Sequence, residues 1–308
     1  MDTFVDSSWY FLRYTDPANT SALASAEAMK AWLPVSLYAG GSEHNTMHLL
    51  YSRFITKALH DMGHVPTNEP FTARRNHGFV LGPDGQKMSK SKGNVVNPDA
   101  EVATHGADAV RLYLAFKGPY DQDGPWDPKG INGVVRFLQR VWAKSHEPLA
   151  SQGSPEADRA LHGATKAITA DLAVLSLNTC VSGLMKLLNA IEGSALSADQ
   201  LGHLVRLLAP FAPHMAEALW RDVLGHKTSV HVASWPEVDE SLLVEETMTI
   251  PVQVNGRVRA VLTVPREAGE DDVLTLARQD EQVAKYLEQG TVQKTIYIPG
   301  KLVNLVVT

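Results

Sequence analysis

The spacing of apolar residues changes twice along the chain and so predicts three kinds of structure. In the first 125 residues, short apolar runs at 34–40 and 78–81 alternate with helical patterns at 47–59 and 99–116, the second broken at Gly106. Apolar residues in the helical patterns recur at intervals of three and four, as on the buried face of an amphipathic helix. Strands that alternate with helices predict an α/β fold with a parallel sheet, whose ligands bind beyond the carboxyl ends of the strands.

Residues 126–236 carry helical periodicity and predict an all-α bundle. The helical segments are expected at 129–145, 156–173, 176–193 and 197–225. Pro210 and Pro213 interrupt the last segment, because a proline removes a backbone donor and clashes with the preceding turn. The short connections favour antiparallel packing of neighbouring helices.

Residues 237–308 predict a small α+β domain of the type β-β-α-β-β. The stretch VQVNGRVRAVLTV places alternating apolar residues on both sides of Asn255-Gly256, the pair typical of a type I′ hairpin turn. A helix is expected at 270–288, followed by strands at 292–298 and 302–307.

Composition indicates an ordinary globular protein. The 308 residues, 44% hydrophobic and 20% charged, suffice for two or three domains. The formal net charge of −6 argues against general coating of nucleic acid but leaves room for a local basic face. The single cysteine, Cys180, lies on an apolar helical stripe, which predicts a core thiol and fits a reducing cytosol. No run approaches the roughly 18 apolar residues of a membrane span, so we expect a cytoplasmic location and no membrane contact.

The stretch GPDGQKMSKSKGN at 82–94 places three lysines between glycines. Lys87, Lys90 and Lys92 repel one another, and the glycines and Pro83 prevent a regular helix or strand. A mobile surface loop of this composition makes chemical sense if it binds a ligand with several negatively charged oxygens.

Lys87-Met88-Ser89-Lys90-Ser91, followed by Lys92-Gly93-Asn94, resembles the KMSKS signature of class I aminoacyl-tRNA synthetases. The flanking stretches resemble the leucyl-tRNA synthetase family, of the bacterial type, in that family's order: DTFVDSSWYFLRY, YAGGSEHNTMHLLYSRF, GADAVRLYLAF, LLAPFAPHMAEALW and the ending from VQVNGRVRA to IPGKLVNLVV. The resemblance covers essentially the whole chain. It implies the second half of a Rossmann-like catalytic domain at 1–125, a tRNA-binding helical bundle like an anticodon-binding domain at 126–236, and a C-terminal tRNA-binding domain at 237–308.

The resemblance also implies an activity: ATP-dependent activation of leucine and its transfer to tRNA(Leu), with ATP and Mg²⁺ as substrate. Lys87 and Lys90 would neutralise the departing pyrophosphate, whereas Lys92 can equally be a solvated lysine. The other residues implied in ATP binding are Gly40, Gly41, Glu43, His44, Met88, Ser89 and Ser91. Glu43 would accept hydrogen bonds from the ribose, although a carboxylate at a helix start also needs no ligand.

Ser7, Ser8 and Trp9 resemble a segment near the aminoacyl site, with core packing as the alternative for Trp9. Asn94 and Asp108 resemble structural residues that secure the loop and the helices behind it. His44 and His48, four residues apart beside Glu43, have a spacing that suits zinc. The order differs from H-E-x-x-H and no third ligand follows, so no protein-bound metal is expected.

The resemblance makes the bundle and the C-terminal domain tRNA-binding parts. Candidate phosphate contacts are Arg136, Arg140 and Lys144 in the bundle and Arg257, Arg259, Lys294 and Lys301 in the last domain. We expect the last four to give one face or edge of the sheet a positive potential. Ordinary solvated positions remain the alternative for each.

The chain also departs from the family. It contains no HIGH-type motif, since HDMGH at 60–64 lies too late in a helix. The first half of the leucine pocket and the editing domain would precede Met1, and bulky residues begin at once with Phe4. We therefore expect the C-terminal part or small subunit of a leucine–tRNA ligase that needs a separate N-terminal half. A non-catalytic tRNA-binding module and a truncated synthetase fragment are the alternatives.

Overall fold

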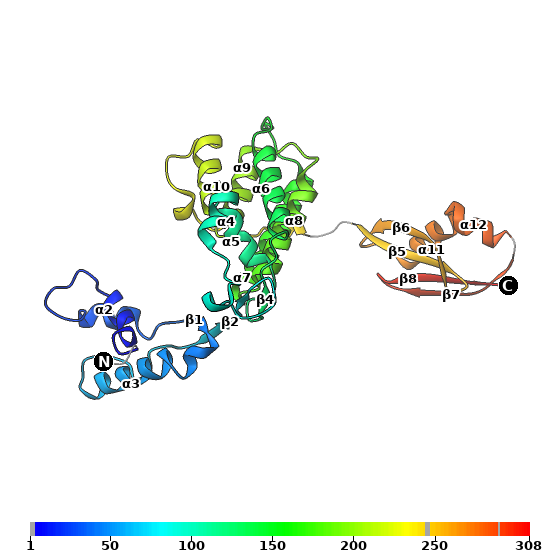
Figure 1. The fold of residues 1–308 in the computed structure, drawn as a ribbon. Helices are drawn as coiled ribbons and strands as arrows, with labels where there is room; N and C mark the ends of the chain where they lie inside the picture. Colours follow the sequence, from blue (N-terminus) through cyan, green and yellow to red (C-terminus); the bar gives the residue numbers. More distant parts are fainter. Residues whose placement is uncertain (1–3, 244–246, 289) are drawn as a thin grey trace. The chain divides into compact units, whose positions relative to one another are not determined.

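The computed structural model describes residues 4–243, 247–288 and 290–308, and the chain divides into two compact units, Met1–Glu237 and Val238–Thr308 (Figure 1). The first unit contains two hydrophobic cores. A small one is built around Phe11, Leu12 and Met29, and a large one spans Ala109 to Val230. The second unit has a core of its own. The division at 125/126 into catalytic and bundle domains stays a prediction.

The N-terminal part of the first unit joins short helices to a two-stranded parallel sheet. Its elements are η1 (Asp6–Ser8), α1 (Tyr10–Tyr14), α2 (Ala26–Trp32), β1 (Tyr38–Gly41), η2 (Ser42–Asn45), α3 (His48–Asp61) and β2 (Arg74–His77). Tyr38 lies opposite Arg74 and Gly41 lies opposite His77. The strand expected at 34–40 therefore begins later and includes both glycines. Val35 forms only an isolated bridge with Phe71.

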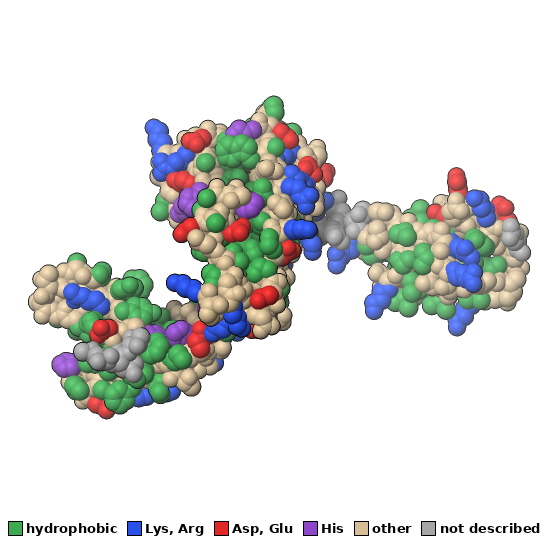
Figure 2. Space-filling model, in the orientation of Figure 1, with side chains coloured by type: hydrophobic (Ala, Val, Ile, Leu, Met, Phe, Trp, Pro, Cys, Tyr) green, Lys and Arg blue, Asp and Glu red, His purple; other side chains and the backbone are tan. Residues whose placement is uncertain are grey.

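The helix α3 is confirmed, but its predicted buried face is buried only in part: Leu59 packs against the small core, whereas other positions of the stripe are exposed. Leu50 and Phe54 of the apolar stripe are 57% and 69% exposed. The buried positions of α3 are instead His48, Leu49, Ser52 and Thr56. Arg53 and Lys57 of the helix also form ion pairs with the Glu69 carboxylate. Leu50 and Phe54 therefore face outward, and Figure 2 shows hydrophobic side chains on the surface of this part.

A second pair of short strands precedes and follows two helices. β3 (Val80–Leu81) pairs in parallel with β4 (Gly124–Pro125), and between them lie η3 (Lys90–Lys92), α4 (Pro98–His105) and α5 (Ala107–Phe116). The predicted break at Gly106 is confirmed. The single parallel sheet is not: the described residues of the first unit form two separate two-stranded parallel sheets. β2 was not expected, because its sequence RRNH contains no apolar residue.

The helical bundle agrees with the sequence periodicity. It comprises α6 (Ile131–Ser145), α7 (Pro155–Ala173), α8 (Leu177–Ile191), α9 (Ala198–Leu208), α10 (Pro213–Ala218), the π-helical turn η4 (Leu219–Val223) and η5 (Val230–Val232). Ser154 and Ser197 cap α7 and α9, and Gln200 completes a capping box with Ser197. Cys180 is fully buried, and burial raises the pKa of its thiol to about 11, which confirms a core thiol.

The helix α5 belongs to the bundle core although it was expected in the catalytic domain. Its Leu112 is completely buried among the bundle residues. The Asp108 carboxylate at the start of α5 accepts hydrogen bonds from the backbone N–H of Met215 at 2.7 Å and from the ring and backbone of His214 at 2.8 and 3.3 Å. Asp108 thus ties α5 to the start of α10, as a structural residue.

The second unit is a four-stranded sheet with two helices on one face (Figure 1). A turn at Glu240–Leu243 (η6) precedes β5 (Thr247–Val254), β6 (Arg257–Pro265), α11 (Glu270–Gln279), α12 (Glu281–Leu287), β7 (Val292–Ile298) and β8 (Leu302–Val307). The strand order is β6-β5-β8-β7, with β5 and β8 parallel. Positive φ angles of 51° at Asn255 and 77° at Gly256 confirm the hairpin turn.

The single helix expected at 270–288 is two helices. Asp280 leaves the helical conformation, and its side chain caps α12 by accepting hydrogen bonds from the N–H groups of Gln282 and Val283. Among the described helices of the whole chain, none combines the length and apolar character that a membrane crossing requires.

One polar contact inside the bundle core makes its stability depend on pH. His203 of α9 is 8% exposed, and its Nε2 lies 2.7 Å from Thr165 Oγ1. Thr165 gives its own proton to the Leu161 carbonyl, so the His203 N–H is the donor. Burial, with help from His162 and Arg206, lowers the pKa of His203 from 6.5 to about 4.

We expect the bundle to lose stability as the pH falls from 6.5 to 4. In this window the unfolded chain binds a proton that the folded chain does not, which by pH 4.5 costs about 2–3 kcal/mol. His203→Gln keeps an N–H donor but cannot titrate, so it should remove this loss. Urea unfolding at pH 7 and 4.5, followed by tryptophan fluorescence, reports only on the first unit, where all six tryptophans lie. The exposed control His64→Gln should behave as wild type, and an identical loss in His203→Gln would contradict the assignment.

Candidate active site

The lysine loop is closed by a clasp between Asp84 and Asn94. Asn94 Nδ2 donates to both carboxylate oxygens of Asp84 at 3.1 Å, and Asn94 Oδ1 accepts from the backbone N–H of Ser89 at 2.8 Å. The backbone N–H of Gln86 donates to Asp84, and this bond and the Asn94 amide lower the pKa of Asp84. A further hydrogen bond runs from Gly82 N–H to the Gln86 carbonyl. The loop is therefore held internally, although it contains no helix or strand beyond one 3-10 turn, η3.

The lysines of the loop and Met88 have different surroundings. Lys90 and Lys92 lie on η3 and are exposed, and neither forms an ion pair with any described residue. The Lys87 ammonium lies 4.6 Å from the centre of the Phe79 ring. The Met88 side chain packs against the bundle core, as does Val96 beyond the clasp. Ser89 and Ser91 hydrogen-bond to each other at 2.8 Å.

A second group of predicted residues surrounds the end of β1. Gly40 and Gly41 are buried, and a side chain on Gly41 would collide with the Glu43 carboxylate. Glu43 Oε2 and His44 Nδ1 are buried without a hydrogen-bond partner. Buried polar atoms normally have partners, so these two orphans mark a position where a ligand or another surface could supply them.

Tyr10, Tyr38 and His48 complete this second group, and sequence reasoning did not find their grouping. His48 Nε2 lies 2.7 Å from the Ser7 carbonyl, and His48 Nδ1 lies 3.2 Å from the Tyr38 hydroxyl. The His48 ring stacks on Tyr38 and is tilted against Tyr10. Burial raises the pKa of the Tyr38 hydroxyl. The available signal was a histidine on the α3 face opposite its apolar stripe.

The predicted residues thus form two groups in the structure. Ser7 lies in the group around β1 through its carbonyl, Ser8 is buried beside it, and Trp9 is 36% exposed. Among the residues that the structure describes, no hydrogen bond, ion pair or ring contact joins this group to the lysine loop. The described residues also include no cluster of three His, Cys, Asp or Glu side chains that could hold a metal ion.

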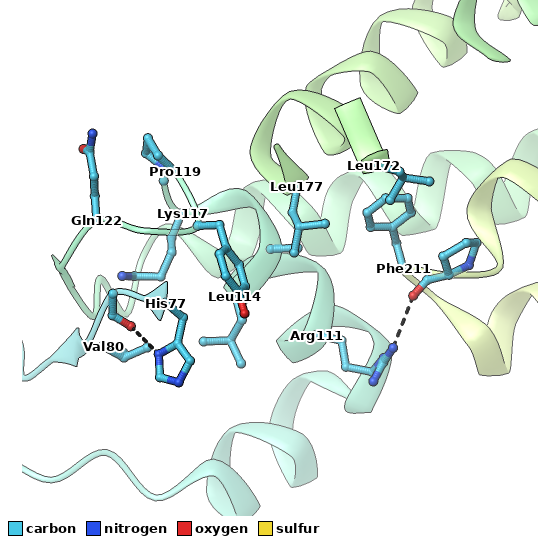
Figure 3. Close-up of a pocket in the computed structure, with 15 residues that line it drawn as sticks. His77, Val80, Arg111, Leu114, Lys117, Pro119, Gln122, Leu172, Leu177 and Phe211 are labelled. Carbon is cyan, nitrogen blue, oxygen red and sulfur yellow. Dashed lines mark hydrogen bonds between the residues drawn. The ribbon is translucent and has the colours of Figure 1, made fainter. Parts of the chain in front are cut away.

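A cavity of about 470 Å³ lies between the strand pairs and the bundle (Figure 3). Its walls include Leu114, Leu177 and Phe211, and Arg111 donates a hydrogen bond to the Pro210 carbonyl at its edge. Burial lowers the pKa of Lys117, whose ammonium donates to the Gly124 carbonyl. None of the predicted site residues lines this cavity.

The candidate phosphate contacts of the bundle differ in availability. Arg136 is exposed. Arg140 makes a two-pronged ion pair with Glu192, which raises the pKa of Arg140. The Lys144 side chain is only 3% exposed, and its ammonium bonds Glu147 and the carbonyls of Glu192 and Ser194. The expectation that Lys144 contacts phosphate is therefore wrong.

The four basic candidates of the second unit are dispersed. Arg257 and Arg259 lie on β6 and Lys294 on β7, which are opposite edges of the sheet, so a single basic edge is excluded. The Arg259 guanidinium lies over the Tyr286 ring of α12, 4.4 Å from its centre. Arg257, Lys294 and Lys301 are exposed.

The comparisons with known proteins agree with these features. Residues 1–127 match the sequence model of tRNA synthetases class I (I, L, M and V), and residues 156–274 match that of the anticodon-binding domain of tRNA ligase. The second match extends past Glu237 into the second unit. The chain is therefore of the class I aminoacyl-tRNA synthetase type.

More specific relatives identify the branch. A leucine–tRNA ligase of Deinococcus radiodurans is 45% identical over 99% of this chain, which spans 38% of that protein's length. The LeuRS agnB2 of Agrobacterium radiobacter K84, solved with tRNA and LeuAMS, is 37% identical with a TM-score of 0.77; the match covers all of this chain and 42% of that one. The chain belongs to the leucyl-tRNA synthetase family and matches its C-terminal part.

A more distant structure shares the fold. Methionyl-tRNA synthetase of Mycobacterium tuberculosis, bound by methionyl-adenylate, has a TM-score of 0.52 at 18% identity, over 70% of this chain and 49% of that one.

The clasp can be tested by limited proteolysis. Asn94→Asp replaces the amide donor by a carboxylate that faces the Asp84 carboxylate, so the loop should open more often. We expect trypsin to cleave after Lys87, Lys90 and Lys92 about 5–10-fold faster, from the loss of two or three hydrogen bonds. Asn97→Asp is the matched control, because aspartate caps α4 as well as asparagine does. Equal cleavage rates in the two variants would show that the clasp does not close the loop.

Proposed function

We propose that the chain provides part of the active site of a leucine–tRNA ligase, which activates leucine with ATP to leucyl-adenylate and transfers it to tRNA(Leu). The observation that carries the proposal is the lysine loop. Its lysines are presented on a clasped backbone in a chain whose relatives include a leucine–tRNA ligase of 45% identity. Because the chain spans 38% of that relative, activity, substrates and partners are all proposed here for a larger assembly.

The proposed chemistry of the loop is charge neutralisation. In adenylation the leucine carboxylate attacks the α-phosphorus of ATP, the bond to the bridging oxygen breaks, and pyrophosphate leaves with the negative charge. Lys87 and Lys90 would stabilise that charge, with Mg²⁺ accompanying ATP. A lysine ammonium is a compact charge suited to oxygens that move during the reaction. Electrostatic stabilisation of this kind is commonly the largest catalytic contribution.

The group around β1 would bind adenosine and leucine. Gly40 and Gly41 allow close approach to the backbone, and the orphan Glu43 Oε2 can accept a hydrogen bond from a ribose hydroxyl. The wall formed by Tyr10, Tyr38 and His48 offers apolar ring surface with polar edges, which suits an aliphatic amino acid. Ser7, Ser8 and Trp9 lie at this end of the chain.

The outer face of α3 supports the need for a partner. Leu50 and Phe54 are exposed there, and Tyr14 and Trp32 are 72% and 70% exposed in the same part of the chain. Several large apolar side chains exposed in one part of a chain favour an interface there. We propose that the N-terminal half of a synthetase covers it and supplies the missing part of the site, including a HIGH-type motif.

A non-catalytic tRNA-binding protein is the second candidate. It is favoured by the exposed Arg257, Lys294 and Lys301 in a unit that folds around its own core. Such a protein would use these groups for tRNA phosphates and would keep the lysine loop without using it.

Leucine-dependent exchange between pyrophosphate and ATP separates the two candidates. We expect none with this chain alone, and exchange when it is mixed with the N-terminal half of a leucyl-tRNA synthetase. Lys90→Ala should reduce exchange by about 10²–10³-fold, the usual cost of one stabilising group. The exposed control Lys227→Ala should have no effect. Lys92→Ala should leave exchange unchanged if Lys92 is only solvated, and should reduce exchange if Lys92 contacts the phosphates. Absence of exchange in the mixture, with tRNA still bound, would favour the binding protein.

The salt dependence of tRNA binding tests the contacts of the second unit. Arg257→Gln should lower the slope of log K against log salt concentration by about 0.7–0.9, the value for one phosphate contact. Lys285→Gln removes the same charge from the exposed face of α12, at a position that is not among the candidate phosphate contacts, and should leave the slope unchanged. Equal slopes for both variants would assign Arg257 to the solvated surface.

A further inference from the structure

Lys87 differs from the other lysines of the loop because its charge already has a partner. Its ammonium lies 4.6 Å from the centre of the Phe79 ring, within the range of a cation–π contact. Lys90 and Lys92 instead lie on the turn η3 and are exposed. In this structure, therefore, one of the two lysines expected to meet the triphosphate is held by an aromatic ring.

The ring that holds Lys87 belongs to the fixed framework beneath the loop. The Phe79 backbone N–H donates to Asp123 Oδ1 at 2.7 Å, and its carbonyl accepts from Gly124 N–H at 3.1 Å. Both bonds attach Phe79 to the segment of β4, which pairs with β3. The Phe79 backbone, from which the ring projects, is thus fixed by contacts that do not involve the lysine loop.

The backbone of Lys87 is also fixed. Lys87 forms an antiparallel bridge with Leu81, and the next residue, Met88, packs against the bundle core. Asn94 holds the Ser89 backbone further on, and before Lys87 the Gln86 N–H donates to the Asp84 carboxylate. Because the backbone is anchored before and after Lys87, its ammonium can leave the ring by rotation of the Lys87 side chain.

We propose that Phe79 is a positioning residue that holds the Lys87 ammonium against its ring until a polyphosphate draws it away. The proposal rests on the proposed function, since it assumes that the loop binds the phosphates of ATP. An exposed cation–π contact corresponds to about a two- to fivefold preference for the held position. A polyphosphate must overcome that preference, so its apparent affinity is lowered by the same factor.

Amine acetylation of the full chain measures the held position directly. After a short pulse of an acetylating N-hydroxysuccinimide ester, mass spectrometry gives the ratio of labelling at Lys87 to that at Lys90. Phe79→Leu keeps an apolar side chain but removes the aromatic face, and should raise this ratio about two- to fivefold. Phe79→Tyr keeps the face and should restore the wild-type ratio. An unchanged ratio in Phe79→Leu, or an equal rise in both variants, would overturn the proposal.

Inorganic tripolyphosphate then tests the displacement. It should protect Lys87 and Lys90 from acetylation, with a half-protecting concentration two- to fivefold lower in Phe79→Leu than in wild type or Phe79→Tyr. If the three proteins are protected at one and the same concentration, the role of Phe79 is overturned while the phosphate-binding role of the loop stands. If tripolyphosphate protects neither lysine in any of them, displacement and the loop's proposed function both fail, whatever the labelling ratio shows.

Discussion

The packing of α5 into the helical bundle is the constraint on which the position of the lysine loop depends. Leu112 of α5 is completely buried in the bundle core, and the Asp108 carboxylate joins α5 to the start of α10. The loop is fastened to the same core on both sides of Asn94, by Met88 and Val96. The lysines are therefore positioned by the bundle, whereas the strands β3 and β4, each two residues long, could not position them alone.

The sequence predicted those elements whose apolar faces meet one another. The bundle helices and the hairpin at Asn255-Gly256 follow from periodicity and turn chemistry, because their partners lie within the same unit. Periodicity equally identified the apolar stripe of α3, but it could not show that Leu50 and Phe54 would be exposed. An apolar pattern identifies a surface that requires burial, and whether a partner is present is a separate matter. The prediction of a single sheet was wrong for a related reason, because each short strand of the first unit pairs with only one other described strand.

The candidate site could likewise be predicted from the sequence only in part. The lysines and glycines could be identified from the sequence, because their chemistry depends on residue type and close spacing. The contacts that hold them could not, because Phe79 and the Asp84–Asn94 clasp act through turns and side-chain directions that leave no periodic signal. His48 was assessed only as a zinc ligand, whereas its nitrogens lie against Ser7 and Tyr38. Spacing along a helix shows which residues share a face, and tertiary packing decides what that face meets.

Buried polar atoms without partners and an exposed apolar stripe lie in the same part of the chain. Glu43 and His44, which retain buried atoms without partners, immediately precede α3, whose outer stripe contains the exposed Leu50 and Phe54. A buried carboxylate oxygen without a partner costs free energy, and so does exposed apolar surface. One additional surface placed against α3 could relieve both costs. Completion of the fold and completion of the proposed nucleotide site would then be a single event, which is a physical reason for the proposed activity to depend on a protein that covers α3.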